Sequence, residues 1–146
     1  MWRVAGRPRG TLEALMTRRI LIIDDSRTTL EVIKVHLMSR GYEFISTASA
    51  TDALAMLSSR VLPDLIISDL AMPDMSGIDL CKRVRASAEW QTIPFVVVTA
   101  KKEDAVRREA FAAGVDGFLR KPIDSMRLQL LVTELLNRPR NAADSR

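Results

Sequence analysis

Near its start the chain contains the sequence Ile20-Leu21-Ile22-Ile23-Asp24-Asp25-Ser26. Its first four residues are apolar and mostly β-branched, and two carboxylates follow at once. A strand that is covered on both faces is apolar at every position, whereas a strand with one wet face alternates. The stretch therefore predicts a buried strand of a parallel sheet that ends at the two aspartates.

Four further short apolar runs follow along the chain, and segments of helical period separate them. This alternation is typical of repeated βαβ units. Five units are too few to close an eight-stranded barrel, so we expect an α/β fold with an open, doubly wound parallel sheet. The predicted strands span residues 20–24, 43–48, 64–68, 94–99 and 117–120.

Apolar stripes at helical spacing predict a helix after each strand. Serines stand at expected N-cap positions, and glycines stand where a left-handed C-cap is expected. These serines are Ser26, Ser49 and Ser76, and the glycines are Gly41 and Gly114. The stripes are Leu30, Ile33 and Leu37; Ala50, Ala53, Leu54 and Leu57; Leu80, Cys81, Val84 and Ala88; Val106, Ala110 and Ala113; and Leu128, Leu131, Val132 and Leu135.

The chain has 146 residues, of which 47% are hydrophobic and 27% are charged. This length has room for one compact core, and the apolar runs are far shorter than the roughly 20 residues of a membrane-spanning helix. Cys81 is the only cysteine, so no internal disulfide forms. Residues 1–15 lack the apolar region of a signal peptide. We therefore expect a cytoplasmic protein with no membrane insertion.

The formal net charge is +4, but the excess of basic residues belongs to the chain ends. Residues 1–19 carry five Arg and one Glu, residues 138–146 carry three Arg and one Asp, and the part between them has 14 basic and 16 acidic residues. Short arginine-bearing tails are usually solvated, so the charge does not favour a nucleic-acid partner. We expect residues 1–18 to be a disordered basic extension, 19–137 to be one domain and 138–146 to be a short basic tail.

Polar residues stand at the ends of four of the five predicted strands. Asp24 and Asp25 end the first strand, Asp69 follows the third, Thr99 ends the fourth and Lys121 follows the fifth. Carboxyl ends of parallel strands share one edge of the sheet, and ligands bind there at the point where the strand order reverses. With strand order 2-1-3-4-5, the first and third strands flank that point. The three aspartates are therefore expected to converge.

Three carboxylates at short range raise each other's pKa values unless a cation compensates. Their oxygen atoms suit Mg²⁺, whereas zinc would need ligands such as the sole histidine, His36, which lies in a predicted helix. A metal ion, an ammonium and a hydroxyl around one carboxylate are what the transfer of a phosphoryl group to that carboxylate needs. Asp69 is the best candidate nucleophile, because it stands alone at the centre of the predicted crevice.

At this point the residues match a known family. Across about residues 19–137 the sequence resembles the receiver domains of bacterial two-component response regulators. The resemblance rests on residues 20–26, 63–77, 97–100 and 114–122. It implies a flavodoxin-like (βα)5 fold with strand order 2-1-3-4-5, and a chemotaxis-type, stand-alone signalling switch that is not an enzyme in the ordinary sense.

The resemblance also implies a role for each acidic residue. Asp69 is similar to the phosphoacceptor, which takes a phosphoryl group from a sensor histidine kinase or a histidine phosphotransfer protein. Asp25, Asp69 and the backbone carbonyl of Ala71 are similar to the Mg²⁺ ligands. Asp24 is similar to a residue that acts on the metal through water.

Further residues are implied to read the phosphorylated state. Thr99 and Lys121 resemble the pair that contacts the phosphoryl group. Phe118 resembles an aromatic switch whose rotamer follows Thr99, although it also fits an ordinary core position. The Lys121-Pro122 peptide bond is cis in this family. Phosphorylation is then expected to change how the surface of the fourth helix, fifth strand and fifth helix binds a downstream protein, which the sequence does not identify.

Two positions near the site influence in this family how long the acyl phosphate survives, and here they are Ala71 and Lys101. Ala71 has no side-chain donor to position a hydrolytic water, so we expect no unusually fast self-dephosphorylation. Two alternatives stay open. One is a receiver-fold interaction protein that no longer accepts phosphate; the other, less favoured, is an Mg²⁺-dependent aspartyl-phosphate hydrolase, which would need a second Asp where Ala71 stands.

Overall fold

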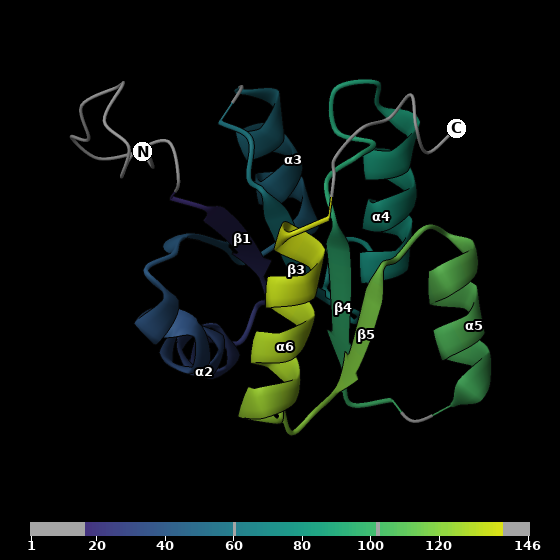
Figure 1. Ribbon diagram of the computed structural model, residues 1–146. Helices are drawn as coiled ribbons and strands as arrows, with labels where there is room; N and C mark the ends of the chain where they lie inside the picture. The colour runs from purple at the N-terminus through teal and green to yellow at the C-terminus, as the bar shows by residue number, and fades with distance from the viewer. Residues whose placement is uncertain (1–16, 60, 102, 139–146) are drawn as a thin grey trace.

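The computed structural model describes residues 17–59, 61–101 and 103–138, and its core is a five-stranded parallel sheet (Figure 1). The strands are β1 (Arg19–Ile23), β2 (Glu43–Thr47), β3 (Leu65–Asp69), β4 (Phe95–Thr99) and β5 (Gly117–Arg120). Their order is β2-β1-β3-β4-β5, which confirms the predicted α/β fold and strand order. The helices are α2 (Arg27–Leu37), the 3₁₀ helix η1 (Met38–Arg40), α3 (Ala50–Ser58), α4 (Gly77–Ala86), α5 (Asp104–Ala112) and α6 (Ser125–Leu136).

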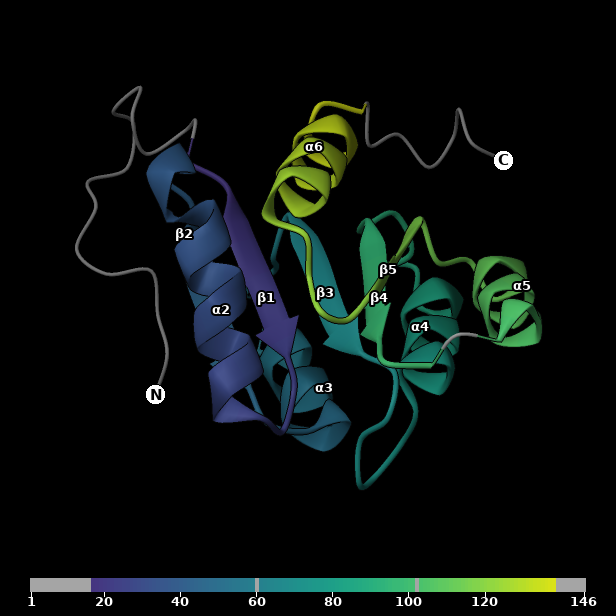
Figure 2. The same cartoon turned by 90° about the horizontal axis from the view of Figure 1, so that it is seen from below.

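Helices cover both faces of the sheet, as the uninterrupted apolar strands require (Figure 2). Leu21 and Ile23 of β1 pack with α3, α4 and α5 on one face. Ile20 and Ile22 pack with α2 and α6 on the other face. Each of these four side chains is at most 1% exposed. Burying such a side chain contributes about 1.5–3 kcal/mol, so a strand with no wet face stabilises both layers at once.

All five predicted strands are present, and four of them have ends that differ from the prediction by one residue. β1 ends at Ile23, so Asp24 lies just beyond it, whereas β3 includes Asp69 as its last residue. The end of a strand depends on hydrogen bonds to its neighbours. The Leu70 amide, for example, donates to the Val98 carbonyl across 3.0 Å. Apolar periodicity does not reveal such bonds.

The predicted capping residues occupy their expected places. The hydroxyl oxygens of Ser26, Ser49 and Ser76 each accept a hydrogen bond from the backbone amide three residues later, at 3.3, 3.1 and 3.0 Å. Each bond satisfies one of the amides that a helix leaves unpaired at its start. Gly41 and Gly114 have φ angles of +76° and +104°, the left-handed conformation predicted for them.

One predicted helix is shorter than expected. α4 ends at Ala86, so Ala88, which the apolar stripe included, is instead exposed in a turn. Ser87 has an extended backbone, and its hydroxyl accepts a hydrogen bond from the Glu89 amide across 3.2 Å. A serine that bonds its own neighbouring backbone competes with the helix, which explains why α4 stops here.

The predictions for the two chain ends fall largely outside the part that the structure describes. Residues 1–16 of the predicted disordered extension and residues 139–146 of the predicted tail lie beyond it. Within it, the carbonyl of Arg18 accepts a hydrogen bond from the Glu43 amide of β2 across 2.9 Å. None of the described helices has the length and apolar character that crossing a membrane requires.

Candidate functional site

The three predicted aspartates meet at the carboxyl edge of the sheet. β1 and β3 are parallel neighbours in which Ile23 lies opposite Ser68, so the residues that follow them lie side by side. Carboxylate oxygens of Asp24, Asp25 and Asp69 all lie within 4.8 Å of one another. Asp24 is 2% exposed and Asp69 is 9% exposed, whereas Asp25 is open to solvent. We call this group the acid cluster.

Lys121 approaches the acid cluster from the end of β5. Its ammonium lies 3.3 Å from an oxygen of Asp24 and 3.3 Å from an oxygen of Asp69. The other oxygen of Asp24 accepts a hydrogen bond from the Ser26 amide across 2.8 Å, and the Asp24 amide donates to the Thr47 carbonyl across 3.1 Å. Asp24 is therefore fixed on both its backbone and its side chain, and Lys121 bridges it to Asp69.

One lysine does not neutralise the acid cluster. Burial, and next the charge of Asp24, raise the pKa of Asp69 above its ordinary value of 3.8, and Lys121 opposes this shift without cancelling it. Burial alone would lower the pKa of Lys121, but attraction by Asp69 and Asp24 outweighs burial and raises it. Further positive charge at this place is therefore favourable.

The donor set of the acid cluster fits Mg²⁺. Magnesium prefers hard oxygen ligands, binds to proteins through one or two carboxylates and keeps several of its waters. The cluster offers two carboxylates held by burial and hydrogen bonds, and a third, that of Asp25, at its open side. It contains neither His nor Cys, which zinc would favour.

Thr99 ends β4, the strand beside β3. In the ladder of these strands Asp69 pairs with Val98, so Thr99 lies one residue beyond the partner of Asp69. Thr99 is 2% exposed, its carbonyl accepts from the Lys121 amide across 2.8 Å, and its hydroxyl accepts from the Lys101 amide across 2.9 Å. The hydroxyl proton of Thr99 remains available to a further acceptor, because a hydroxyl both donates and accepts.

The loop after β3 is held at two points that the sequence did not predict. The Gly77 amide donates to the Leu70 carbonyl across 2.8 Å, and a Cβ at Gly77 would press on the backbone carbonyl of Asp69. Only glycine leaves room for this approach.

Asp74 is the second point at which this loop is fastened. Its carboxylate accepts hydrogen bonds from the Thr51 hydroxyl (2.6 Å), the Thr51 amide (2.7 Å) and the Ala50 amide (3.3 Å) at the start of α3. These bonds, that of the hydroxyl first, lower the pKa of Asp74 to about 2. Ala71 therefore lies in a loop that is anchored to two helices.

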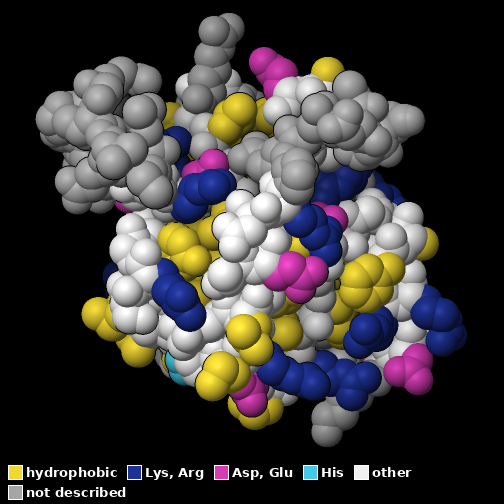
Figure 3. Space-filling view, in the orientation of Figure 1, with side chains coloured by type: hydrophobic (Ala, Val, Ile, Leu, Met, Phe, Trp, Pro, Cys, Tyr) yellow, Lys and Arg dark blue, Asp and Glu magenta, His cyan; other side chains and the backbone are white. Residues whose placement is uncertain are grey.

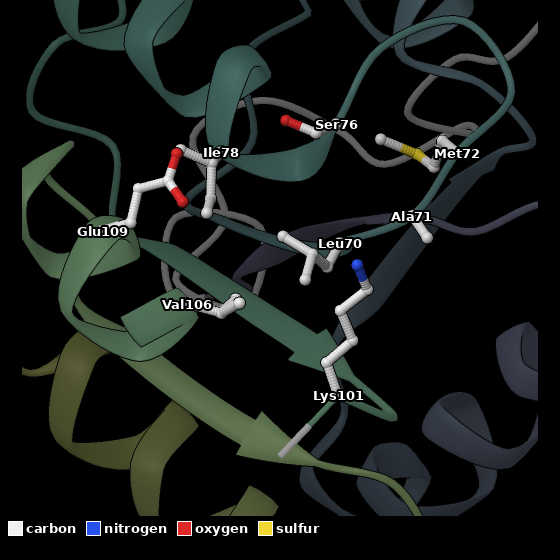
Figure 4. A pocket seen from close by; sticks show the side chains of 8 residues that line it. All are labelled: Leu70, Ala71, Met72, Ser76, Ile78, Lys101, Val106 and Glu109. Atoms are coloured by element: carbon white, nitrogen blue, oxygen red, sulfur yellow. The ribbon is translucent and has the colours of Figure 1, made fainter. Parts of the chain in front are cut away.

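A cavity of about 320 Å³ lies beside this loop, between α4 and α5 (Figure 4). Leu70, Ile78 and Val106 contribute apolar surface to it. Figure 4 shows the ammonium of Lys101 extending toward Ala71, while the carboxylate of Glu109 lies on the far side of the cavity. Lys101 and Ala71, the two positions expected to influence phosphate lifetime, thus face each other.

Phe118 lies on β5 and is neither fully buried nor fully exposed. Its side chain is partly buried and packs against the core on the face of α3, α4 and α5. Both interpretations of this residue, switch and core, stay predictions. The Lys121-Pro122 peptide bond is cis, as the family resemblance implied.

Two residues that could carry chemistry lie away from the acid cluster. His36 lies in α2, where its carbonyl accepts a hydrogen bond from the Gln129 side chain of α6 across 3.0 Å. Cys81 lies on the buried face of α4, and burial raises the pKa of its thiol to about 11. A thiol with so high a pKa is a poor nucleophile and metal ligand.

Comparisons with a family model, with curated proteins and with solved structures all identify the same family. The model of the response regulator receiver domain family matches residues 20–133. An uncharacterized 14.6 kDa protein of Leptolyngbya boryana is 33% identical over 123 residues, which are 84% of this chain and 93% of that protein. The phosphate regulon transcriptional regulatory protein PhoB of Rhizobium meliloti is 31% identical over 123 residues. Those residues are 84% of this chain and 54% of PhoB, so the chain spans about half of that regulator.

A solved structure is similar over the same region. The chemotaxis response regulator CheY4 of Vibrio cholerae matches with a TM-score of 0.75 and 28% sequence identity. The match covers 82% of this chain and 99% of that protein. Most of the described part of this chain therefore has a structural counterpart in CheY4.

Proposed function

The chain belongs to the response regulator receiver domain family, and on that premise we propose that Asp69 accepts a phosphoryl group from the phosphohistidine of a sensor kinase or a histidine phosphotransfer protein. Receiver domains are signalling proteins, so this reaction serves as a switch. The main support for the proposal is that the Asp69 carboxylate lies close to the carboxylates of Asp24 and Asp25 and to the ammonium of Lys121.

In the proposed reaction, an oxygen of Asp69 attacks the phosphorus of the phosphohistidine. The bond from phosphorus to nitrogen breaks, and its electron pair returns to the imidazole, which takes up a proton. Lys121 supports this step because its ammonium lies 3.3 Å from an oxygen of Asp69, where it can neutralise charge on the transferred group. Thr99 supports it with a hydroxyl proton that can be donated to a phosphoryl oxygen.

The same proposal includes a magnesium ion. The carboxylates of Asp25 and Asp69 and the backbone carbonyl of Ala71 would hold it, with Asp24 acting through water. When bound, Mg²⁺ neutralises the oxygens of the transferred phosphoryl group. The closeness of the three carboxylates supports this assignment, and burial and next the charge of Asp24 raise the pKa of Asp69, which a bound cation would oppose.

Phosphorylation is proposed to act at a distance through Thr99 and Phe118. Asp69 would gain negative charge, the Thr99 hydroxyl would turn toward it, and Phe118 would respond to the space that Thr99 leaves. The surface formed by α5, β5 and α6, which we call the output surface, would then change its affinity for a protein partner. The partly buried side chain of Phe118 on β5 supports this route.

The two alternatives receive less support. A hydrolase of aspartyl phosphates needs a general acid two residues after the nucleophile, and Ala71 cannot serve. An interaction protein that has lost phosphorylation has no need for Thr99, Lys121 and three aspartates at the same edge of the sheet.

Intact-mass spectrometry after treatment with acetyl phosphate and Mg²⁺ tests the proposal. The wild-type chain is expected to gain one phosphoryl group, Asp69→Ala none, and Asp79→Asn, an exposed acid at the start of α4, the same as wild type. An adduct on Asp69→Ala would place the acceptor elsewhere. No adduct on any variant would favour the interaction protein.

A further inference from the structure

A basic pocket lies on the output surface, next to the acid cluster. It has a volume of about 520 Å³. Figure 3 shows Lys and Arg side chains gathered along the lower edge of the face that carries α6 and β5. The side chains that line the pocket and matter here are Arg107, Phe118, Arg120, Lys121, Asp124 and Arg127. Four cations and one carboxylate line this concavity, but the ammonium of Lys121 already pairs with Asp24 and Asp69, and the guanidinium of Arg120 lies 3.7 Å from Asp104. Arg107 and Arg127 therefore supply the positive charge that an anion would meet there.

Several of these groups are already held in place. The guanidinium of Arg107 lies over the ring of Phe111, 5.3 Å from its centroid. Asp124 accepts a hydrogen bond from the Arg127 amide across 3.0 Å, which caps α6 and partly satisfies the carboxylate that lines the pocket. A cation stacked on an aromatic ring loses less conformational freedom when it binds a ligand. The pocket therefore offers a pre-oriented guanidinium to a negatively charged group.

Lys121 connects the pocket to the acid cluster. The residue lines the pocket, and its ammonium lies 3.3 Å from oxygens of both Asp24 and Asp69. Phe118, the proposed switch residue, lines the same pocket. A change of charge at Asp69 would therefore alter the electrostatic interactions of Lys121, which also lines the pocket.

We propose that the downstream partner presents an acidic segment of protein that binds in this basic pocket. The inference rests on the proposed function, because it names the chemistry of the partner that the output surface takes. A nucleic acid fits less well, since Glu103, Asp104 and Glu109 are exposed on α5 or at its start. An extended phosphate backbone along this face would meet those carboxylates, whereas a short acidic segment can enter the pocket between them.

Fluorescence anisotropy with a fluorescein-labelled octaglutamate peptide tests the inference at low ionic strength. Arg107→Glu reverses a charge that lines the pocket, and Arg108→Glu makes the same change on the neighbouring residue, which lies outside the pocket lining. We expect the peptide to bind about tenfold more weakly to Arg107→Glu than to wild type, and Arg108→Glu to bind nearly as wild type does. Backbone amide chemical shifts of the wild-type protein should change around Phe118 and Arg127 when the peptide is added.

Any of four results would overturn the inference. Equal losses in both variants would show general charge attraction, and amide shifts elsewhere would place the peptide outside the pocket. A DNA duplex that binds in place of the peptide, or a dimer that Arg107→Glu dissociates in sedimentation, would identify a different occupant. Both variants should still gain one phosphoryl group from acetyl phosphate, so a failure here is distinguishable from a failure of the proposed function.

Discussion

A methyl group added at Gly77 tests how closely the backbone of the proposed phosphoacceptor is packed. The Cβ of Gly77→Ala would press on the carbonyl oxygen of Asp69 and lie 3.2 Å from the Cα of Leu70. Both contacted atoms belong to the backbone, so no side-chain rotation can relieve them. Overpacking of this kind costs about 1–3 kcal/mol, and the better helix propensity of Ala returns at most about 1 kcal/mol. We expect the free energy of unfolding to fall by about 1–2 kcal/mol.

Urea unfolding measures that loss, and titration calorimetry with Mg²⁺ measures whether Asp69 has moved. Gly77→Ala should bind Mg²⁺ several-fold more weakly than wild type. Gly41→Ala is the matched control, because its residue has a φ of +76° and nothing within 4 Å of an added Cβ. It should lose about 1–2 kcal/mol through backbone strain alone and keep its Mg²⁺ affinity. The reasoning fails if Gly77→Ala unfolds and binds Mg²⁺ as wild type does, or if both variants lose Mg²⁺ affinity equally.

Four further outcomes test separate parts of the account. Asp69→Asn should raise the midpoint of thermal unfolding at neutral pH without Mg²⁺. Burial, and next a neighbouring carboxylate, raise the pKa of Asp69, so the ionised form of this residue destabilises the fold. The stability gained by the variant should therefore shrink as the pH falls through that raised pKa. A lower midpoint at neutral pH would contradict this. At pH values above 3.8, the ordinary pKa of Asp, Asp74→Asn should be less stable than wild type in urea unfolding. This difference in stability should disappear as the pH falls to about 2, because the pKa of Asp74 is lowered to that value. Arg85→Ala removes a guanidinium that donates four hydrogen bonds and should cost about 2 kcal/mol in urea unfolding; a loss within error of zero would show that these bonds contribute nothing. With Ala71 and Lys101 beside the site, radiolabelled phosphate should persist well beyond seconds, and loss of the label within seconds would refute that expectation.

The parallel sheet and the convergence of the acid cluster are predictable from the sequence because both follow from periodicity. Runs such as residues 20–23 are apolar at every position, as a strand covered on both faces requires. Once the strands are parallel and neighbours, Asp24 and Asp69 must share an edge. The geometry adds the exact place of the Lys121 ammonium, 3.3 Å from an oxygen of each of the two carboxylates.

The contacts that fasten the site were not predictable in the same way. Asp74 accepts hydrogen bonds from Thr51 at the start of α3, more than twenty residues earlier in the chain. No local sequence pattern reveals a contact between residues so far apart. Gly77 had a local signal, since glycine is unfavourable inside a helix and here follows directly after the cap residue Ser76. The role of Arg107 depends on which helix borders β5, and periodicity places a residue on a helix without naming its neighbours.

Mapping the phosphoryl group within the chain tests whether Asp69 is the phosphoacceptor. Borohydride reduces an aspartyl phosphate to homoserine, so tandem mass spectrometry of the treated, digested protein identifies the phosphorylated residue. After acetyl phosphate with Mg²⁺, the account predicts homoserine at Asp69 alone, and none when the metal is chelated. Homoserine at Asp24 or Asp25, or equal conversion of Asp69 without Mg²⁺, would contradict it.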